Sequence, residues 1–492
     1  MTITEAFEGS KSISAFNNTC TIPTWLNGQQ VTSNSAFDVV SPLDQKLLYH
    51  CSSASEEDAL SAIDSAQKAF LTWSQTKPRV RRDIFLRAAD EFSRRKEELR
   101  HYSLTETGMS DAFFAFEHEG AVQACRDVAG LIQVATTASM PVIDAEGSSS
   151  AVLNEPYGVV LGIAPWNAPN VLGLRACLQP LAMGNTVILK GPEAAPATYW
   201  AIASILHAAG LPPGCLNTLY YRPEDAAKIT NTLISHPLVK KINFTGSTAV
   251  GSILASLAGK YLKPTVMELG GKAPAIVCED ANIEHAALQC SLGAFLHAGQ
   301  VCMSTERIIV HAAIADSFRA ALKAAIETVF PETRMPQLIS SAPVLKNQKM
   351  LAEALSKGGI LIHGNTASLS EHSKTQMSVA VVEKVDPSMD MYFTEGFGPT
   401  VSLFVVRSDE EAIKLANDTE YGLTSAIFTE DLRRAFRIAK AIESGAVHIN
   451  SMTIHDETNL PHGGAKSSGF GRFNSLSGLR EWVRTKTITW KD

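Results

Sequence analysis

The spacing of hydrophobic positions changes several times along the chain, and each change predicts a different kind of element. Before about residue 55, short apolar runs are separated by turn residues, which is typical of short strands. From Ser55 the spacing is helical, and Asp58 three residues later predicts a capping box at the start of a helix. A charged amphipathic stretch predicts one further helix over 80–99.

From residue 157 onward, apolar strands alternate with helices. The first series has strands at 159–164, 186–190, 216–221 and 241–244, and helices at 169–182, 196–209, 225–235 and 249–257. The second series begins near residue 264, with strands at 273–277, 308–310, 379–382 and 401–405, and helices at 313–329 and 410–417. Such alternation is typical of parallel sheets covered by helices. We therefore expect an α/β protein with two Rossmann-like, doubly wound parallel-sheet domains.

Two polar segments, 148–154 and 485–490, alternate with a period of two and fit neither series. We expect them to lie together as a small β flap used for oligomerisation. The uncharged stretch 157–174 has the length of a membrane helix, but Pro165, Asn167 and Asn170 interrupt it. It therefore predicts a buried strand, a turn and a helix.

The composition is that of an ordinary globular protein, with 492 residues of which 45% are hydrophobic and 19% charged. The 43 basic and 50 acidic residues give a net charge of −7, so no overall basic field attracts nucleic acid or an anionic membrane. The eight cysteines include no C-x-x-C pair, and no secretory signal is legible. We expect a cytoplasmic protein that binds neither nucleic acid, membrane nor metal.

Three polar residues have surroundings that suit catalysis. Cys302 follows an apolar helix and precedes an apolar strand, so a turn can expose its thiol as a nucleophile. Glu268 ends an apolar strand just before two glycines, which suits a general base. Asn167 also follows a strand, and its amide can donate to a developing oxyanion. Taken one at a time, Cys302 could instead be a core thiol, Glu268 a helix cap or salt-bridge residue, and Asn167 a turn residue.

The segment 244–251 joins a strand to a helix, with Gly246 and Ser247 at the junction. Val250, Ile253, Leu254 and Leu257 then keep the spacing of one helix face. The junction would offer free N–H groups at a positive helix end, which is a phosphate-binding arrangement. It is neither a P-loop nor the usual G-x-G-x-x-G fingerprint.

Seven segments occur together in an order that resembles the aldehyde dehydrogenase superfamily. They are 165–167, 190–193, 244–251, 268–272, 300–302, 395–399 and 461–469. Within the superfamily, 165–169 with Arg175, and 448–450 leading to 455–457, look most like the salicylaldehyde and vanillin dehydrogenase branch. The resemblance implies that the Cys302 thiolate attacks the aldehyde and that Asn167 and the Cys302 N–H hold the oxyanion. It also implies that Glu268 activates the water that hydrolyses the thioester.

The resemblance also implies a cofactor site and a substrate tunnel. The implied cofactor residues are Trp166, Lys190, Glu193, Phe244, Gly246, Ser247, Val250, Gly251, Leu269, Glu395 and Phe397. Because the Glu193 carboxylate accepts from a ribose 2′-hydroxyl and repels a 2′-phosphate, NAD is expected, with NADP possible because of Lys190. The implied substrate residues are Val171, Arg175, Leu296, Met303, His455 and His462.

Three departures from the family pattern concern these sites. The segment 219–224 lacks the glycines usual on the adenine side, His462 replaces a common Phe, and Arg175 stands where many relatives have an aromatic residue. Arg175 shares a helix face with Val171 and Leu178, where it could meet an oxygen on an aromatic aldehyde, a semialdehyde carboxylate or only a structural partner. The run Phe113, Phe114 and Phe116 could form an aromatic wall or belong to the core.

The expected function is NAD(P)-dependent oxidation of an aromatic hydroxylated aldehyde to its acid. A semialdehyde dehydrogenase, a CoA-acylating variant and a non-catalytic binding or structural member are the alternatives. The resemblance implies an NAD-binding domain of residues 1–140 and 157–268, a catalytic domain of residues 269–455 and oligomerisation segments of residues 141–156 and 470–492. The expected partners are a small-molecule aldehyde and further copies of the chain, in a homodimer or homotetramer.

Overall fold

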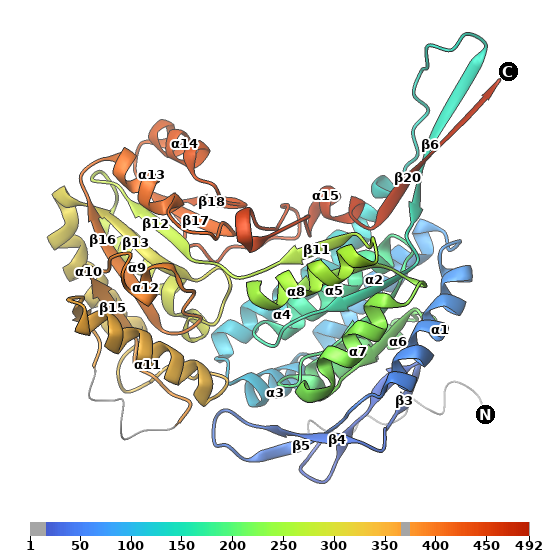
Figure 1. The fold of residues 1–492 in the computed structure, drawn as a ribbon, viewed down its shortest axis with the longest axis horizontal. Helices are drawn as coiled ribbons and strands as arrows, with labels where there is room; N and C mark the ends of the chain where they lie inside the picture. The colour runs from blue at the N-terminus through green and yellow to red at the C-terminus, as the bar shows by residue number, and fades with distance from the viewer. Residues whose placement is uncertain (1–15, 366–373, 492) are drawn as a thin grey trace. The chain divides into compact units, whose positions relative to one another are not determined.

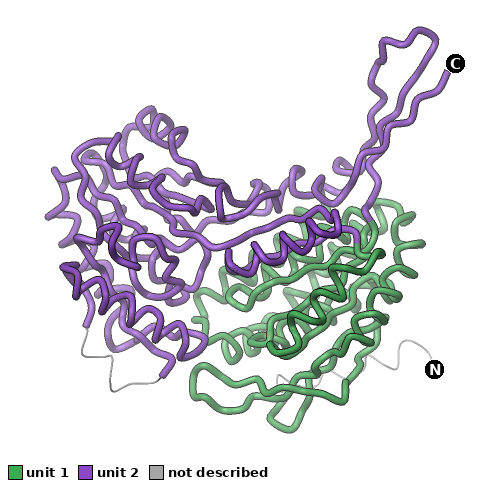
Figure 2. The backbone as a smooth tube through the Cα atoms, viewed as in Figure 1, with its two compact units in different colours: residues 1–129, 158–239 green, residues 130–157, 240–492 purple. Residues whose placement is uncertain are grey.

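The computed structural model describes residues 16–365 and 374–491 and divides into two compact units (Figure 2). Unit 1 consists of Met1–Ala129 with Gly158–Val239, and unit 2 consists of Gly130–Tyr157 with Lys240–Asp492. The long helix α4 (Asp111–Ala135) begins in unit 1 and ends in unit 2.

The strands of unit 1 form a main sheet and a smaller one. In the main sheet, β7 (Val159–Ile163), β8 (Thr186–Lys190) and β9 (Leu216–Leu219) are parallel neighbours. The sheet continues antiparallel through β2 (Thr24–Leu26) and β3 (Gln29–Val31). In the smaller sheet, β5 (Leu47–Ser52) lies between β1 (Thr21–Ile22) and β4 (Ala36–Val40). The predicted parallel strands are confirmed.

The helices that pack onto the main sheet of unit 1 are α1 (Glu56–Trp73), α5 (Pro169–Ala182) and α6 (Pro196–Ala208). α2 (Pro78–Arg94) and α3 (Lys96–Thr107) pack against α6, and α7 (Pro223–Ser235) packs against α1. The capping box of Ser55 and Asp58 at the start of α1 is confirmed. The single helix predicted over 80–99 is wrong, because Arg95 leaves helical geometry (φ −96°, ψ 21°) and separates α2 from α3. Its guanidinium is instead held by Glu98 and by the Ser204 hydroxyl.

Unit 2 contains a seven-stranded sheet in the order β14-β15-β16-β13-β12-β17-β18. Its strands are β12 (Ala273–Val277), β13 (Thr305–His311), β14 (Ile360–His363), β15 (Ala380–Glu383), β16 (Thr400–Val406), β17 (Thr424–Phe428) and β18 (Ala446–Ile449). All neighbours are parallel except β14 and β15. The predicted second parallel sheet is therefore confirmed, and with it the α/β fold class.

Helices cover both faces of this sheet (Figure 1). Alternate strand residues point to opposite faces, so Ala275 and Val277 pack with α9 (Ile283–Phe295) and α10 (Ala315–Val329). Ile276 between them packs with α13 (Asp409–Asn417) and α14 (Leu432–Ala441). A further buried cluster joins α11 (Ser341–Ser356) and α12 (Asp390–Phe393) to β15. Burial on both faces explains why these strands are continuous apolar runs in the sequence.

A second group of strands in unit 2 carries much of the predicted chemistry. β10 (Val239–Thr245) is parallel to β11 (Thr265–Glu268), which is antiparallel to the short β19 (Gly469–Phe470). α8 (Thr248–Lys260) lies between β10 and β11 in the chain, and α15 (Ser475–Arg480) follows β19. The predicted apolar face of α8 is only partly buried, because Leu254 is buried but Val250 and Ile253 are exposed.

The C-terminal strand β20 (Val483–Lys491) pairs with β6 (Ser148–Pro156) in an antiparallel two-stranded ribbon (Figure 1). Every residue of β20 has a partner in β6, from Val483 opposite Pro156 to Lys491 opposite Ser148. The expected association of the two polar segments is thus confirmed, although each strand is longer than predicted.

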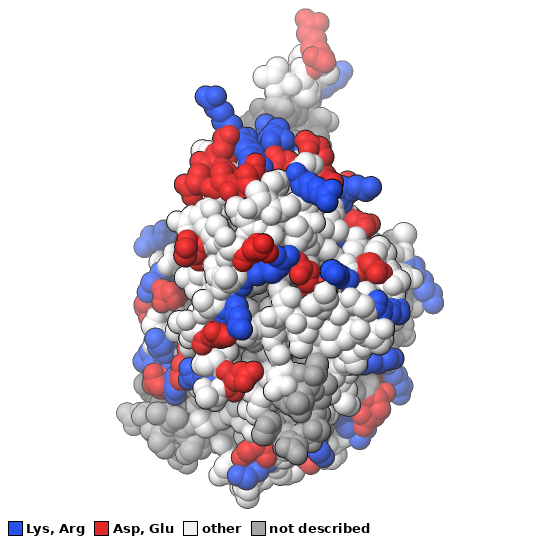
Figure 3. All heavy atoms as spheres, turned by 90° about the vertical axis from the view of Figure 1, so that its left-hand side faces the viewer, with Lys and Arg blue, Asp and Glu red and all other residues white. Residues whose placement is uncertain are grey.

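Charged residues of both signs are interspersed over the face of the molecule shown in Figure 3. Within the described part of the chain, no helix is both long enough and apolar enough to cross a membrane.

Candidate active site

Cys302 lies on a tight turn of unit 2 that leads from α9 to β13. After α9, the short helix η2 (Leu296–Gly299) contains three successive residues with positive φ, namely His297 (49°), Ala298 (58°) and Gly299 (72°). Left-handed backbone is unfavourable for residues with a Cβ, so the turn stores local strain immediately before the cysteine. A Cβ on Gly299 would lie 2.2 Å from the Gly398 carbonyl oxygen, which explains the glycine at this position.

Gln300 fixes the turn through its side-chain amide. The Gln300 Nε2 donates to the carbonyls of His297 and Gln337, both at 3.1 Å, and its Oε1 accepts from the Ile339 N–H at 2.9 Å. The side chain is fully buried, so these hydrogen bonds are protected from water. They tie the segment before Cys302 to a neighbouring loop of unit 2 and thereby hold the thiol in place.

The thiol of Cys302 faces the carboxylate of Glu268. The Sγ–H donates to Glu268 Oε1 over 3.6 Å, and the Thr245 hydroxyl donates to Glu268 Oε2 over 3.3 Å. Glu268 ends β11 and is only 1% exposed, as the sequence predicted for a carboxylate at the end of an apolar strand. A nucleophile and a base in direct contact form the arrangement that covalent catalysis requires.

Backbone packing around Glu268 leaves no room for side chains at two glycines. A Cβ on Gly271 would lie 2.2 Å from the Cys302 carbonyl oxygen, and one on Gly469 would lie 2.1 Å from the Met267 carbonyl oxygen. Gly469 also has a φ of 113° and pairs with Glu268 across the β11–β19 ladder. These close approaches fix the backbone of the base and bring that of the nucleophile near it.

Exposure distinguishes Cys302 from most of the other cysteines. Cys302 and Cys20 are half-buried, whereas the remaining six thiols are buried. Burial raises the pKa of each buried thiol, from Cys51 to Cys290, which keeps them protonated and unreactive. Cys302 thus lies on a turn, as predicted, and is partly exposed.

His462 contacts the same oxygen of the Glu268 carboxylate as Cys302 does. Its Nε2 lies 2.9 Å from Glu268 Oε1, and its Nδ1 lies 3.6 Å from Asp456 Oδ1. The sequence placed His462 near the substrate, but the position of its imidazole beside Glu268 was not predicted. No pattern in the sequence signals this contact, because 194 residues separate the two positions.

Glu395 is held in unit 2 by a network of buried charges. Its Oε1 accepts from the Gly271 N–H at 2.9 Å, and the next two backbone N–H groups donate to Glu306. Lys272 Nζ lies 2.6 Å from Glu306 Oε2, with both side chains almost fully buried. Burial, followed by the nearby Glu306 charge, raises the pKa of Glu395 to about 7. No pattern in the sequence predicted a role for Lys272 or Glu306.

The junction between β10 and α8 differs from the prediction in one respect. The Gly246 N–H is not free, because it donates to the Glu268 carbonyl at 3.1 Å. Ser247 is the N-cap of the 13-residue α8, and its exposed side chain accepts from the Val250 N–H at 3.4 Å. The hydroxyl and the first turn of α8 are therefore the part of the junction that can meet an anion.

Of the other expected cofactor residues of unit 2, Leu269, Gly251 and Phe244 lie around β11 and α8. Leu269 follows Glu268 directly, and a Cβ on Gly251 would come within 2.4 Å of its side chain. Phe244 is buried at the end of β10, and a Cβ on Gly246 would meet its ring at 2.5 Å. Phe397 is half-buried with a positive φ of 48°.

In unit 1, Trp166 and Asn167 lie on the turn between β7 and α5. Asn167 is 4% exposed and Trp166 is half-buried. The Tyr199 hydroxyl donates to the Pro165 carbonyl at 2.8 Å, and Glu117 accepts from the Asn170 and Val171 N–H groups. The buried Glu117 carboxylate thus caps α5, and burial raises its pKa to about 7.

Two expected substrate residues follow on α5. Val171 is half-buried in the first turn, and Arg175 is only 5% exposed one turn later. Of the aromatic run on α4, Phe113 and Phe114 are buried and Phe116 is half exposed. The first two belong to the core, as one of the two alternatives predicted.

Lys190 and Glu193 form an ion pair at the end of β8 in unit 1. Lys190 Nζ lies 2.5 Å from Glu193 Oε1 and 5.1 Å from the centre of the Tyr221 ring. The Glu193 side chain is 33% exposed, so one face of the pair meets solvent. The pair combines an acceptor for hydroxyls with a cation that attracts phosphate.

The remaining expected substrate residues lie in unit 2. Leu296 is half-buried at the start of η2, and Met303 is 8% exposed directly after the nucleophile. The His455 ring lies 4.8 Å from the His448 ring between centres, tilted by 38°, and its Nε2 lies 2.9 Å from Glu457 Oε1. In the described ranges 16–365 and 374–491, no cluster of three or more His, Cys, Asp or Glu side chains could hold a metal ion.

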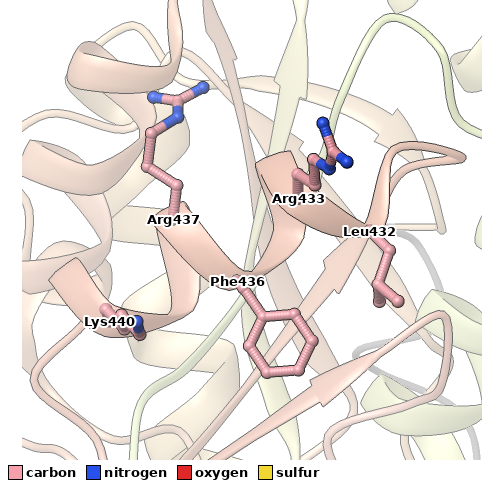
Figure 4. A pocket seen from close by; sticks show the side chains of 5 residues that line it. All are labelled: Leu432, Arg433, Phe436, Arg437 and Lys440. Carbon is pink, nitrogen blue, oxygen red and sulfur yellow. The ribbon is translucent and has the colours of Figure 1, made fainter.

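A separate hollow on the surface of unit 2 is lined by α14 alone. Figure 4 shows Leu432 and Phe436 on this helix together with Arg433, Arg437 and Lys440. These side chains include no thiol, carboxylate or imidazole, so the hollow offers none of the chemistry assembled around Cys302.

The chain is similar to known proteins over most of its length. Residues 25–488 match the profile described as "Aldehyde dehydrogenase family". Vanillin dehydrogenase from Pseudomonas fluorescens is 38% identical over 476 residues, which cover 95% of this chain and 97% of that protein.

Two solved structures extend the comparison to the fold. The crystal structure of a salicylaldehyde dehydrogenase from Pseudomonas putida G7 complexed with salicylaldehyde has a TM-score of 0.92 at 33% identity, covering 96% of this chain and 98% of that one. Betaine aldehyde dehydrogenase from Staphylococcus aureus, in complex with NAD+, has a TM-score of 0.89 at 27% identity, covering 97% and 95%.

Proposed function

The chain belongs to the aldehyde dehydrogenase family, and we propose that it oxidises an aromatic hydroxylated aldehyde to the carboxylic acid with NAD as the hydride acceptor. The observation that carries the proposal is the contact of 3.6 Å between the Cys302 thiol and the Glu268 carboxylate. The likeness over most of the chain to vanillin and salicylaldehyde dehydrogenases supports the aromatic substrate class.

The residues of unit 2 suit a two-stage reaction. Glu268 takes the thiol proton, and the Cys302 thiolate adds to the carbonyl carbon of the aldehyde. After hydride loss the substrate is held on Sγ as a thioester. Once Glu268 has given up the thiol proton, it takes a proton from the water that hydrolyses the thioester. For Asn167 we propose the role of oxyanion donor, so Asn167→Ala should cost about 3 kcal/mol of transition-state stabilisation.

The cofactor supplies the hydride acceptor when it is bound. In unit 1, the Lys190–Glu193 pair fits an adenine ribose, because the carboxylate accepts from ribose hydroxyls. In unit 2, Ser247 at the start of α8 fits a pyrophosphate, and the Glu395 carboxylate fits the hydroxyls of the second ribose. We propose that Phe397 contacts the nicotinamide ring. NAD is the proposed cofactor, and NADP is the weaker alternative.

Arg175 is the residue that we propose to select the substrate. It is buried and cationic, so a phenolic or hydroxyl oxygen on the aldehyde would gain a charge-assisted hydrogen bond. Val171, Leu296, Met303 and His455 would supply the rest of the substrate wall. A semialdehyde carboxylate would suit the same cation, which makes a semialdehyde dehydrogenase the alternative to test.

A substrate panel tests the proposal directly. We expect salicylaldehyde and vanillin to be oxidised with higher kcat/KM than aliphatic aldehydes or succinic semialdehyde, with absorbance of the reduced nicotinamide as the readout. Arg175→Leu should lower kcat/KM for hydroxybenzaldehydes by about ten- to a hundred-fold and spare benzaldehyde. A preference of the wild type for succinic semialdehyde would favour the alternative, and no oxidation of any aldehyde would contradict the proposal.

The remaining proposals concern organisation. We assign cofactor binding to residues 1–140 and 157–268, catalysis to residues 269–455, and assembly of a homodimer or homotetramer to 141–156 and 470–492. We also propose a cytoplasmic location, in line with the free thiols of the chain.

A further inference from the structure

His462 has a fixed position next to the candidate base. Its backbone N–H donates to the Phe473 carbonyl at 2.9 Å, and its carbonyl accepts from the Phe473 N–H at 2.8 Å. The residue is 7% exposed, so its imidazole is surrounded by protein. The direction of the side chain is therefore set by the fold of unit 2.

The imidazole connects two carboxylates. Its Nε2 lies 2.9 Å from Glu268 Oε1, the same oxygen that faces Cys302 Sγ at 3.6 Å. Its Nδ1 lies 3.6 Å from Asp456 Oδ1, and that oxygen accepts from Asn474 Nδ2 at 2.8 Å. Thiol, carboxylate, imidazole and second carboxylate thus follow one another in space.

We propose that His462 is a positioning residue that aims Glu268 at Cys302 and takes up the proton that Glu268 removes. The Cys302 S–H bond breaks and a bond forms between that proton and Glu268 Oε1. In the neutral imidazole the ring proton is assigned to Nδ1, on the side of Asp456, so the unprotonated Nε2 takes the proton from Glu268. This transfer leaves a thiolate, an ionised Glu268 and an imidazolium. No electrons are transferred, and Asp456 stabilises the new positive charge.

Charged and titratable groups face His462 from four segments. Glu268 lies on β11, Cys302 on the turn before β13, and Asp456 on the loop after β18. His448 on β18 is the fourth, and burial lowers its pKa to about 4, so it is neutral at neutral pH. The His455 ring contacts the His448 ring at a tilt, and its Nε2 contacts Glu457. Glu268 and Asp456 lie at the two nitrogens of the imidazole, so both carboxylates can pair with the imidazolium once it has formed.

Alkylation of Cys302 tests this role without aldehyde or cofactor. The rate of reaction with iodoacetamide is measured against pH by mass spectrometry of the Cys302 peptide, in the whole protein. His462→Phe keeps the volume and removes both nitrogens, whereas His462→Gln keeps a donor toward Glu268 but cannot take a proton. His285→Gln is the matched control, because His285 is an exposed histidine of the same unit.

We expect both His462 variants to raise the pH midpoint of Cys302 alkylation by about one pH unit, because the proton loses its acceptor. Asp456→Asn, which leaves the Glu268 contact in place, should raise the midpoint by less. His285→Gln should not change it. An unchanged or lowered midpoint in folded His462→Phe would overturn the proposal. If His462→Phe does not fold, an unchanged or lowered midpoint in His462→Gln would overturn it.

Turnover supplies the second readout, and this part rests on the proposed function. His462→Phe should lower kcat by about 10- to 100-fold with little change in the KM for the aldehyde or the KM for NAD. A poorly positioned Glu268 slows the chemical step but does not affect binding. His462→Gln should retain more activity than His462→Phe, and equal activity in the wild type and His462→Phe would overturn the proposal. A raised alkylation midpoint in a protein that oxidises no aldehyde would contradict the proposed function and leave this inference standing.

Discussion

At the scale of single residues, the site depends on which thiol and which carboxylate are brought into contact. Eight thiols and fifty acidic residues are available, but burial disables six of the thiols and the end of β11 directs one carboxylate at Cys302. In this contact the thiol is the candidate nucleophile and the carboxylate is the candidate base. Removing either group should therefore stop the reaction at a different stage.

Cys302→Ala should abolish turnover while NAD binding, followed by quenching of protein fluorescence, stays within about twofold, because the thiol contributes to the covalent step alone. Glu268→Gln should instead release close to one equivalent of reduced cofactor per site in a rapid burst, followed by a slow steady rate. Cys20→Ala removes the other half-buried thiol and serves as the control. Normal steady turnover in either active-site variant would remove that residue from its role.

Cofactor choice should depend on the ion pair at the end of β8. Glu193→Ser leaves Lys190 without its partner at 2.5 Å and removes the repulsion of a 2′-phosphate. We expect the ratio of kcat/KM for NADP over NAD to rise about tenfold, or ~1.4 kcal/mol. Steady-state kinetics with both cofactors measure this ratio, with Glu119→Ser, on the exposed side of α4, as the control. An unchanged ratio would mean that Glu193 does not meet the ribose.

The individual chemical groups were predictable from the sequence, but their contacts were only partly so. Cys302 and Glu268 could be proposed because each sits where an apolar element ends, which is a local signal. The His462 imidazole and the Lys272–Glu306 pair could not, since those contacts join positions 194 and 34 residues apart. The Gly246 N–H was wrongly expected to be free, because its acceptor is a carbonyl of another strand.

At the scale of elements, the predicted strands and helices followed the apolar spacing closely. The error at Arg95 occurred where a tertiary contact determines where a helix ends. Arg95 ends α2 because its guanidinium binds Glu98 and Ser204, which no periodicity reveals. Two helices of unit 1 likewise begin on buried carboxylates contributed by other helices. Glu117 caps α5, and Glu106 accepts from the Ala197 and Thr198 N–H groups at the start of α6.

Glu106 should give the stability of the protein a measurable pH dependence. Burial raises its pKa in the folded protein to about 7, against an ordinary value of 4.5. The folded state therefore binds the proton more tightly, so this contribution is fully present below about pH 4.5 and is lost as the pH rises through 7. A shift of this size corresponds to about 3 kcal/mol.

Thermal unfolding midpoints across this pH range test the cap. The unfolding midpoint of Glu106→Gln should fall less steeply with rising pH than that of the wild type, because an amide does not ionise. Glu106→Ala should unfold at lower temperature at every pH, because it leaves the buried Tyr49 and Thr198 hydroxyls without this acceptor. The free energy of unfolding should fall by about 1–3 kcal/mol. Glu119→Gln, an exposed carboxylate of α4, should leave the slope unchanged. Parallel slopes for the wild type and Glu106→Gln would contradict this account.

At the scale of the whole molecule, the ribbon of β6 and β20 is the part least able to stand alone. A two-stranded ribbon is marginally stable in water, and its strands are mostly exposed or half-buried. In the two-stranded sheet β20 has β6 on one side, so its other edge carries backbone groups open to a further strand. Ile488 and Trp490, two residues apart and thus on one face of β20, are 43% and 40% exposed.

These features lead us to expect that a second copy of the chain covers the ribbon in a homodimer or homotetramer. Placing charges on its apolar face with the double substitution Ile488→Lys and Trp490→Lys should release a smaller species, because desolvating two ammonium groups opposes association. Light scattering coupled to size exclusion measures the mass of the assembly. Leu262→Lys is the matched control, because Leu262 is 91% exposed and lies outside the ribbon. A monomeric wild type, or a double variant of unchanged mass, would show that the ribbon does not hold the assembly together.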